Sequence, residues 1–159
     1  MVSVLLSFCL KMSLSRKNTY LFNSNTYIVL CVFWTFIVFT LLLMPASSFS
    51  SAPKLPFLAF LKLPHMDKVV HFIMFAIEAW LIYRSIELKN HLNNKHLAAI
   101  TIVFISLMGL TTEILQGLTY NTQKRMFSLL DLFFDILASV CVVLILNLVS
   151  RKQKQGRKN

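Results

Sequence analysis

Three of the six carboxylates in this 159-residue chain lie in one stretch of the sequence, Glu113–Asp135. Apolar runs long enough to form membrane-spanning helices flank this stretch on both sides. A charge near the centre of a bilayer costs about 3 kcal/mol or more unless it is paired or hydrated. The stretch therefore predicts part of a polar site at one face of a membrane. Its polar residues are Glu113, Gln116, Lys124, Arg125, Ser128, Asp131 and Asp135.

A second stretch, Asp67-Lys68-Val69-Val70-His71, is predicted to supply the other part of this site. Asp67, His71 and Glu78 are spaced so that they share one face of a helix that turns by about 100° per residue. At this spacing we expect the Asp67 carboxylate to hold the His71 imidazole in one tautomer. The face therefore combines an acid–base group with two carboxylates.

Ser128, Asp131 and Asp135 share another helical face by the same spacing. Two carboxylates four residues apart repel each other if both are ionised, so one is expected to bind a proton, a cation or a basic side chain. Arg125 is the basic residue best suited to bidentate contact with a carboxylate or phosphate. The basic candidates near this face are Lys68, Lys124 and Arg125.

No metal site is predicted by these motifs; zinc is not expected, and a hard cation held by oxygens together with a phosphate is the alternative that they leave. The set offers one imidazole nitrogen and several oxygens, but the sequence has no HExxH motif and no histidine pair near the carboxylates. No cofactor is predicted either, and Ser128 lies in no nucleophile motif. The alternative to a functional site is that the polar groups pair only with one another and set the register of the helices.

The composition identifies the elements that would position these residues. The chain is 57% hydrophobic and only 14% charged, with a mean hydropathy of +0.68, whereas a soluble domain has about a quarter of its residues charged. We therefore predict an all-α fold, a polytopic membrane helical bundle of about four transmembrane helices. The net charge of +10 does not predict nucleic-acid binding, because the basic residues lie at the chain ends and between the apolar runs.

The apolar runs divide the chain into three parts. A basic N-terminal tail covers residues 1–26, a transmembrane domain covers 27–149, and a basic tail covers 150–159. Small residues after Pro45 are similar to a signal-peptidase site, but about 26 residues precede the first apolar run, which favours an uncleaved helix. The predicted spans lie near residues 27–44, 66–86, 96–116 and 128–149.

The distribution of basic residues predicts the orientation of the bundle. With four spans, eleven of the sixteen Lys and Arg residues fall on the side that holds both termini, and five fall on the other side. The positive-inside rule then predicts that both termini lie in the cytoplasm. The membrane that the chain crosses is predicted to be the inner, cytoplasmic membrane of the cell. The start of the second span, the end of the third and the start of the fourth would all lie at the outer face, where we expect an outward-facing polar cleft.

Three ordered motifs in residues 63–149 resemble the VanZ-like family of small bacterial integral membrane proteins. The motifs read D-K-x-x-H-F-x-x-F, E-x-x-Q and R-x-x-S-x-x-D, and the family usually continues with Asn and glycines where this chain has Asp135 and Ala138. The resemblance implies a role at the cell envelope and a link to glycopeptide (teicoplanin) resistance. The residues that carry it are Asp67, Lys68, His71, Phe72, Phe75, Glu113, Gln116, Arg125, Ser128 and Asp131.

Three functions are compatible with this pattern. The first is binding of an anionic membrane lipid or a lipid-linked cell-wall intermediate, and the absence of an established catalytic motif favours it. The second is an enzyme acting on such a lipid with His71 as the acid–base group, supported by Asp67, Asp131 and Glu113. The third is a proton-coupled carrier that uses Glu78 and the Asp131/Asp135 pair. The predicted ligand-binding residues are Lys68, His71, Glu113, Gln116, Arg125, Ser128, Asp131 and Asp135.

Overall fold

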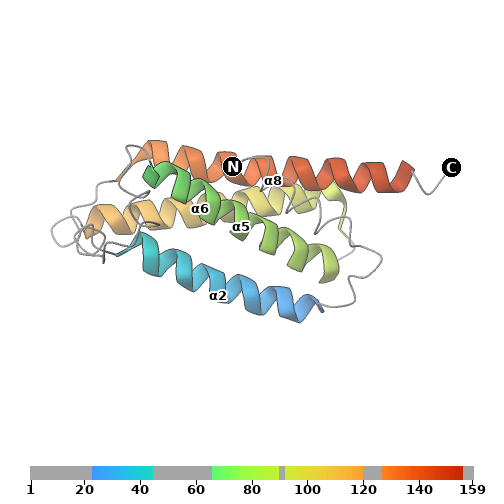
Figure 1. The fold of residues 1–159 in the computed structure, drawn as a ribbon, viewed down its shortest axis with the longest axis horizontal. Helices are drawn as coiled ribbons and strands as arrows, with labels where there is room; N and C mark the ends of the chain where they lie inside the picture. The colour runs from blue at the N-terminus through green and yellow to red at the C-terminus, as the bar shows by residue number, and fades with distance from the viewer. Residues whose placement is uncertain (1–22, 45–65, 90–91, 120–126, 156–159) are drawn as a thin grey trace, which may run out of the picture.

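Four helices make up the regular structure of the described part of the chain (Figure 1). The computed structural model describes residues 23–44, 66–89, 92–119 and 127–155, and for residues 66, 67 and 151–155 it describes the backbone alone. Within these residues every regular element is a helix, which confirms the all-α prediction. The helices are α2 (Ser24–Leu42), α5 (Met66–Lys89), α6 (Asn94–Leu118) and α8 (Leu129–Gln155).

The four helices lie alongside one another with alternating direction along the chain (Figure 1). The last turns of α2 and α6 and the first turns of α5 and α8 therefore lie at the same end of the bundle, on the left in Figure 1. We call this the polar end, because Lys68, His71, Glu113 and Asp131 belong to these turns and Ser128 directly precedes α8. Helix α5 packs against α2, α6 and α8, and α6 also packs against α8.

Helix α5 is the most buried of the four spans and α2 the least. In the most apolar window of each span, 61% of the α5 residues but only 17% of the α2 residues are buried inside the bundle. Phe75 and Ala79 of α5 are fully buried in the core with Ile105 of α6 and Ala138 of α8. The position of α5 explains why chemically active groups on its first turns can meet groups from two other helices.

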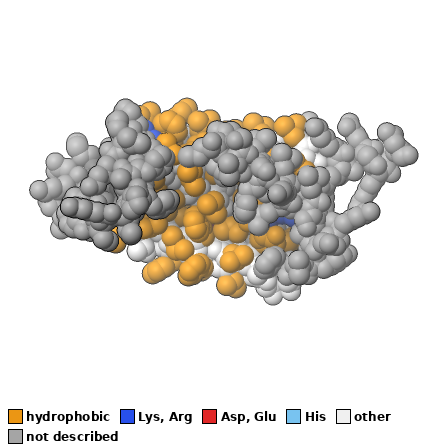
Figure 2. All heavy atoms as spheres, viewed as in Figure 1, with side chains coloured by type: hydrophobic (Ala, Val, Ile, Leu, Met, Phe, Trp, Pro, Cys, Tyr) orange, Lys and Arg blue, Asp and Glu red, His pale blue; other side chains and the backbone are white. Residues whose placement is uncertain are grey.

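The outer surface of the bundle is apolar. Large hydrophobic side chains such as Val29, Phe33 and Phe36 of α2 are more than half exposed, and Figure 2 shows hydrophobic side chains across the middle of the visible face. All four helices are long and apolar enough to cross a membrane, with mean hydropathies of 1.5 to 2.6 over their spans. The helices are thus those of a multi-pass membrane protein by length and composition.

Two helix ends differ from the sequence prediction in an informative way. Helix α5 continues to Lys89 and α8 to Gln155, whereas the apolar pattern ends near residues 86 and 149. The extra turns carry basic residues, and positive charge near the C-terminus of a helix is stabilised by the helix dipole. The start of α8 is set by Ser128, whose Oγ accepts a hydrogen bond from the Asp131 N–H at 3.3 Å in an N-cap arrangement.

Candidate functional site

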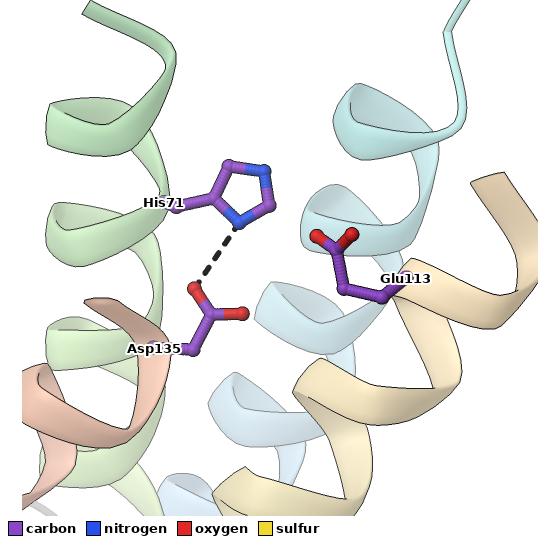
Figure 3. Close-up of side chains that lie close together, drawn as sticks. All are labelled: His71, Glu113 and Asp135. Carbon is purple, nitrogen blue, oxygen red and sulfur yellow. Dashed lines mark hydrogen bonds and ion pairs between the residues drawn. The ribbon is translucent and has the colours of Figure 1, made fainter. Parts of the chain in front are cut away.

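His71 and Asp135 form the centre of the polar end. His71 lies in the second turn of α5 and its Nδ1 is 3.1 Å from Oδ1 of Asp135, which lies in the second turn of α8 (Figure 3). Both residues are buried, with 3% and 0% of their surfaces exposed. The contact joins two helices that run in the same direction, and it orients the imidazole through a carboxylate, as is common for acid–base and metal-binding histidines.

Glu113 reaches the same place from α6. Its Oε2 accepts a hydrogen bond from the backbone N–H of Ser128 at 2.7 Å, which ties the last part of α6 to the residue before α8. The first N–H groups of a helix have no partner within it, so the Glu113 carboxylate supplements the side-chain cap at this helix end. Figure 3 shows the Glu113 carboxylate directed toward His71 and Asp135.

We call His71, Glu113 and Asp135 the buried triad. One ligand atom from each of the three lies within 4.8 Å of the others. Glu113 Oε1 and Asp135 Oδ2 are buried and have no hydrogen-bond partner among the described residues. A buried polar atom without a partner costs about 1–3 kcal/mol, and more when it is charged. The triad is therefore able to take up a proton or a cation.

Gly109 makes room for the triad on α6. A Cβ atom at this position would lie 2.9 Å from Oδ2 of Asp135 and 3.1 Å from Cδ1 of Leu132, closer than real Cβ contacts. Gly109 is therefore a close-packing point between α6 and α8, where the absence of a side chain leaves room for the Asp135 carboxylate.

Lys68 and Asp131 lie next to the triad at its outer edge. Lys68 Nζ is 3.3 Å from Asp131 Oδ1, and the two side chains are 18% and 11% exposed. The expectation that one of the two α8 carboxylates takes a basic partner is met by this ion pair, with His71 as the partner of the other. Among the described side chains of this cluster, Lys68 carries one full positive charge. A second positive charge would have to come from protonation of His71.

Gln116 is brought to the same end of the bundle but has a different contact. It is buried, and its Nε2 donates a hydrogen bond to the backbone carbonyl of Leu42 at 3.0 Å. The last carbonyl groups of a helix have no partner within it, so Gln116 caps the end of α2 from α6. This contact positions α2 and leaves Gln116 outside the triad.

Several predicted site residues lie outside the described part of the chain. Lys124 and Arg125 belong to residues 120–126, and the side chain of Asp67 is not described although its backbone is in the first turn of α5. The predicted Asp67–His71 contact is therefore untested. The structure instead assigns Asp135, from another helix, to Nδ1 of the imidazole.

A second buried polar group lies about two turns further along α5. Glu78 Oε1 accepts hydrogen bonds from Thr35 Oγ1 at 2.6 Å and Cys31 Sγ at 3.4 Å, both on α2, and Trp34 Nε1 donates to the Met74 carbonyl at 3.1 Å. The sequence motifs give Cys31 no partner and do not predict this contact. The spacing of Cys31 and Thr35, which places both on one face of α2, was the available signal.

Comparisons with known proteins identify no relative of this chain. No family model matches the sequence, and neither curated proteins nor solved structures gave a match. The resemblance to the VanZ-like family consequently depends on the motif residues alone, and the functional interpretation depends on the geometry of the polar end.

Proposed function

We propose that this chain is a VanZ-like integral membrane protein of the bacterial cell envelope that binds the anionic headgroup of a membrane lipid or a lipid-linked cell-wall intermediate. The observation that carries this proposal is the convergence of polar side chains from α5, α6 and α8 at one end of an otherwise apolar bundle. Lipid headgroups lie at the level of helix ends in a bilayer, so a ligand that reaches this end must approach from the headgroup region.

The basic residues of the polar end favour a phosphate-bearing headgroup. The side chain of Lys68 is partly exposed beside Asp131, and Lys124 and Arg125 belong to the connection between Thr119, at the end of α6, and the start of α8. A Lys or Arg near an anionic membrane surface contributes about 1 kcal/mol to binding, and Arg is suited to bidentate contact with phosphate. Arg125 is thus the proposed main ligand of the headgroup.

The orientation of the chain completes this proposal. With both termini in the cytoplasm, the polar end would face outward, on the side where cell-wall intermediates are used. The motif resemblance connects such a position with glycopeptide resistance, which we regard as the physiological context to test after the ligand is known.

Native mass spectrometry in mild detergent tests the proposal. We expect the wild-type protein to retain an anionic lipid and Arg125→Ala to lose it. Arg151→Ala is a matched control, because Arg151 lies in the last turns of α8 at the opposite end of the bundle, and it should retain the lipid. A lipid-free wild type, or equal retention by both variants, would contradict headgroup binding at the polar end.

The contact between His71 and Asp135 favours a second candidate, an enzyme that acts on the same lipid. An imidazole held by a buried carboxylate is a common acid–base arrangement, and Glu113 or Asp131 would be its partner. His71→Ala distinguishes the two functions. The variant should retain the lipid in both cases. If the protein is an enzyme, the wild type converts the lipid to a product and His71→Ala does not, and the same mass spectra would record this difference.

A further inference from the structure

We propose that His71, Glu113 and Asp135 form a binding site for one divalent cation of the Zn²⁺ or Mn²⁺ class. The site goes beyond the lipid-binding proposal and does not depend on it. Each residue comes from a different helix, α5, α6 and α8 respectively, and all three side chains point toward one another in Figure 3.

The spacing of the three side chains fits a cation. Their ligand atoms lie within 4.8 Å of one another. Nitrogen and oxygen ligands lie about 2.0–2.2 Å from Zn²⁺, so ligand atoms around one ion are separated by roughly 3–4 Å. The observed spacing is therefore close to that of ligands around one ion, and rotation of the side chains can supply the remaining approach.

Two unpartnered oxygen atoms point to a missing ligand. Glu113 and Asp135 are both 0% exposed, and Glu113 Oε1 and Asp135 Oδ2 lack hydrogen-bond partners within the described ranges. The other oxygen of each carboxylate is already held, Glu113 Oε2 by the Ser128 N–H and Asp135 Oδ1 by His71. The Ser128 contact orients the Glu113 carboxylate and leaves Oε1 for a cation, which is how outer contacts position metal ligands. His71 Nδ1 cannot donate a proton to Asp135 and bind a metal at the same time, so a bound ion would replace the proton between these two groups and release it.

The negative charge of the two triad carboxylates also favours a bound cation. Lys68 is already paired with Asp131, so the charge of the Glu113 and Asp135 carboxylates must be balanced by other groups. A divalent ion bound by both carboxylates and a neutral imidazole gives a neutral centre. Neutrality matters here because an uncompensated charge is costly in the buried part of a membrane bundle.

The donor atoms indicate the class of ion. Mg²⁺ and Ca²⁺ prefer sites made of oxygen only, whereas imidazole nitrogen suits first-row transition metals and carboxylates extend the set to Mn²⁺. The two described cysteines, Cys31 and Cys141, are not members of the triad. Three protein ligands leave at least one coordination position for water or for a phosphate oxygen of a ligand.

Metal binding to the full-length protein in detergent, after removal of bound ions with a chelator, tests this site. Binding of Mn²⁺ is followed by electron paramagnetic resonance, and Zn²⁺ is added as a competitor. We expect about one ion per chain in the wild type. Glu113→Gln and Asp135→Asn should weaken Mn²⁺ binding at least about tenfold, because each loses an anionic ligand.

The controls separate ligand loss from unfolding. Glu113→Gln keeps an oxygen that can accept the Ser128 N–H, so the helix contact survives while the charge is removed. Glu78→Gln removes a fully buried carboxylate that lies on α5 and is not part of the triad. This variant should bind Mn²⁺ with the affinity of the wild type. Thermal unfolding of each protein with and without Mn²⁺ provides a second readout, and we expect the ion to raise the unfolding temperature of the wild type and Glu78→Gln only.

Two results would overturn the proposal. One is a folded wild type that takes up neither Mn²⁺ nor Zn²⁺ at millimolar concentration, which requires no variant. The other is a folded Glu113→Gln or Asp135→Asn protein with wild-type affinity. Because no lipid measurement enters the test, failure of headgroup binding and failure of the cation site remain distinguishable.

Discussion

The His71 imidazole is oriented by Asp135, a residue 64 positions away in the sequence, across a distance of 3.1 Å between Nδ1 and Oδ1. The contact joins the first turns of α5 to those of α8, two helices that are in direct contact along the bundle. A histidine held in this way is positioned by tertiary packing, so its chemistry depends on the relative placement of the two helices.

The strength of this contact can be measured with a double-mutant cycle. Polar contacts between membrane helices contribute about 0.6 kcal/mol on average and up to about 2 kcal/mol. For His71→Ala, Asp135→Ala and the double variant we expect a coupling energy near the upper end of this range, because both groups are buried. Reversible unfolding in detergent gives the three values. A coupling energy indistinguishable from zero would mean that the two side chains do not interact in the folded protein.

Gly109→Ala should destabilise the bundle although alanine favours helices. The new Cβ would lie 2.9 Å from Asp135 Oδ2, 3.1 Å from Leu132 Cδ1 and 3.3 Å from Asp135 Cβ, so the Asp135 and Leu132 side chains must shift. Overpacking of this kind costs about 1–3 kcal/mol. We expect a lower unfolding temperature than that of the wild type and, if the cation site is correct, weaker Mn²⁺ binding.

Gly117→Ala is the matched control for this variant. A Cβ at Gly117, on the same helix, would meet only Phe127 Cβ at 3.5 Å, an ordinary van der Waals distance. This variant should be as stable as the wild type or slightly more stable, because alanine exceeds glycine in helix propensity by about 1 kcal/mol. Equal destabilisation by the two substitutions would show that contact with Asp135 is not the cause.

Lys68→Met should destabilise the polar end by about 1–2 kcal/mol, since removing one partner of a partly buried ion pair leaves the other charge uncompensated. The Asp131 side chain is only 11% exposed. Combining Lys68→Met with Asp131→Asn should recover much of the loss, because both charges are then removed. The control is Arg84→Met, which breaks the pair with Glu87 within α5, 2.6 Å apart, at the opposite end of the helix. If the double variant is less stable than Lys68→Met alone, the pair is not the source of the effect.

Much of the architecture follows from the sequence. Four apolar runs predict four helices, and an even number of antiparallel helices brings the start of α5, the end of α6 and the start of α8 to one end. For this reason the sequence alone predicts that His71, Glu113 and Asp131 lie together. The repulsion between Asp131 and Asp135 predicts a proton, a cation or a basic side chain at one of the two, and the structure shows a basic side chain, Lys68, at Asp131.

The partners of individual atoms do not follow from the sequence. Helices that are apolar around most of their circumference give little information about their rotation, so nothing indicated that Asp135 would face Nδ1 of His71. The bond from Gln116 to the Leu42 carbonyl depends on where α2 ends beside α6. Contacts of this kind are set by packing in three dimensions, which one-dimensional periodicity does not contain.

Glu78 provides the test of a proton-coupled carrier. Glu78→Gln keeps an oxygen that can accept from Thr35 and Cys31, so we expect its stability to lie within about 1 kcal/mol of the wild type, whereas Glu78→Leu leaves both donors without this acceptor and should cost about 1–2 kcal/mol. Proton uptake by proteoliposomes under an imposed pH gradient then separates structure from transport. Because Glu78 contacts α2 and is not a member of the buried triad, we expect equal proton uptake by wild type and Glu78→Gln, which fits a structural role for this carboxylate. Loss of uptake in a stable Glu78→Gln protein would contradict that role and favour the carrier.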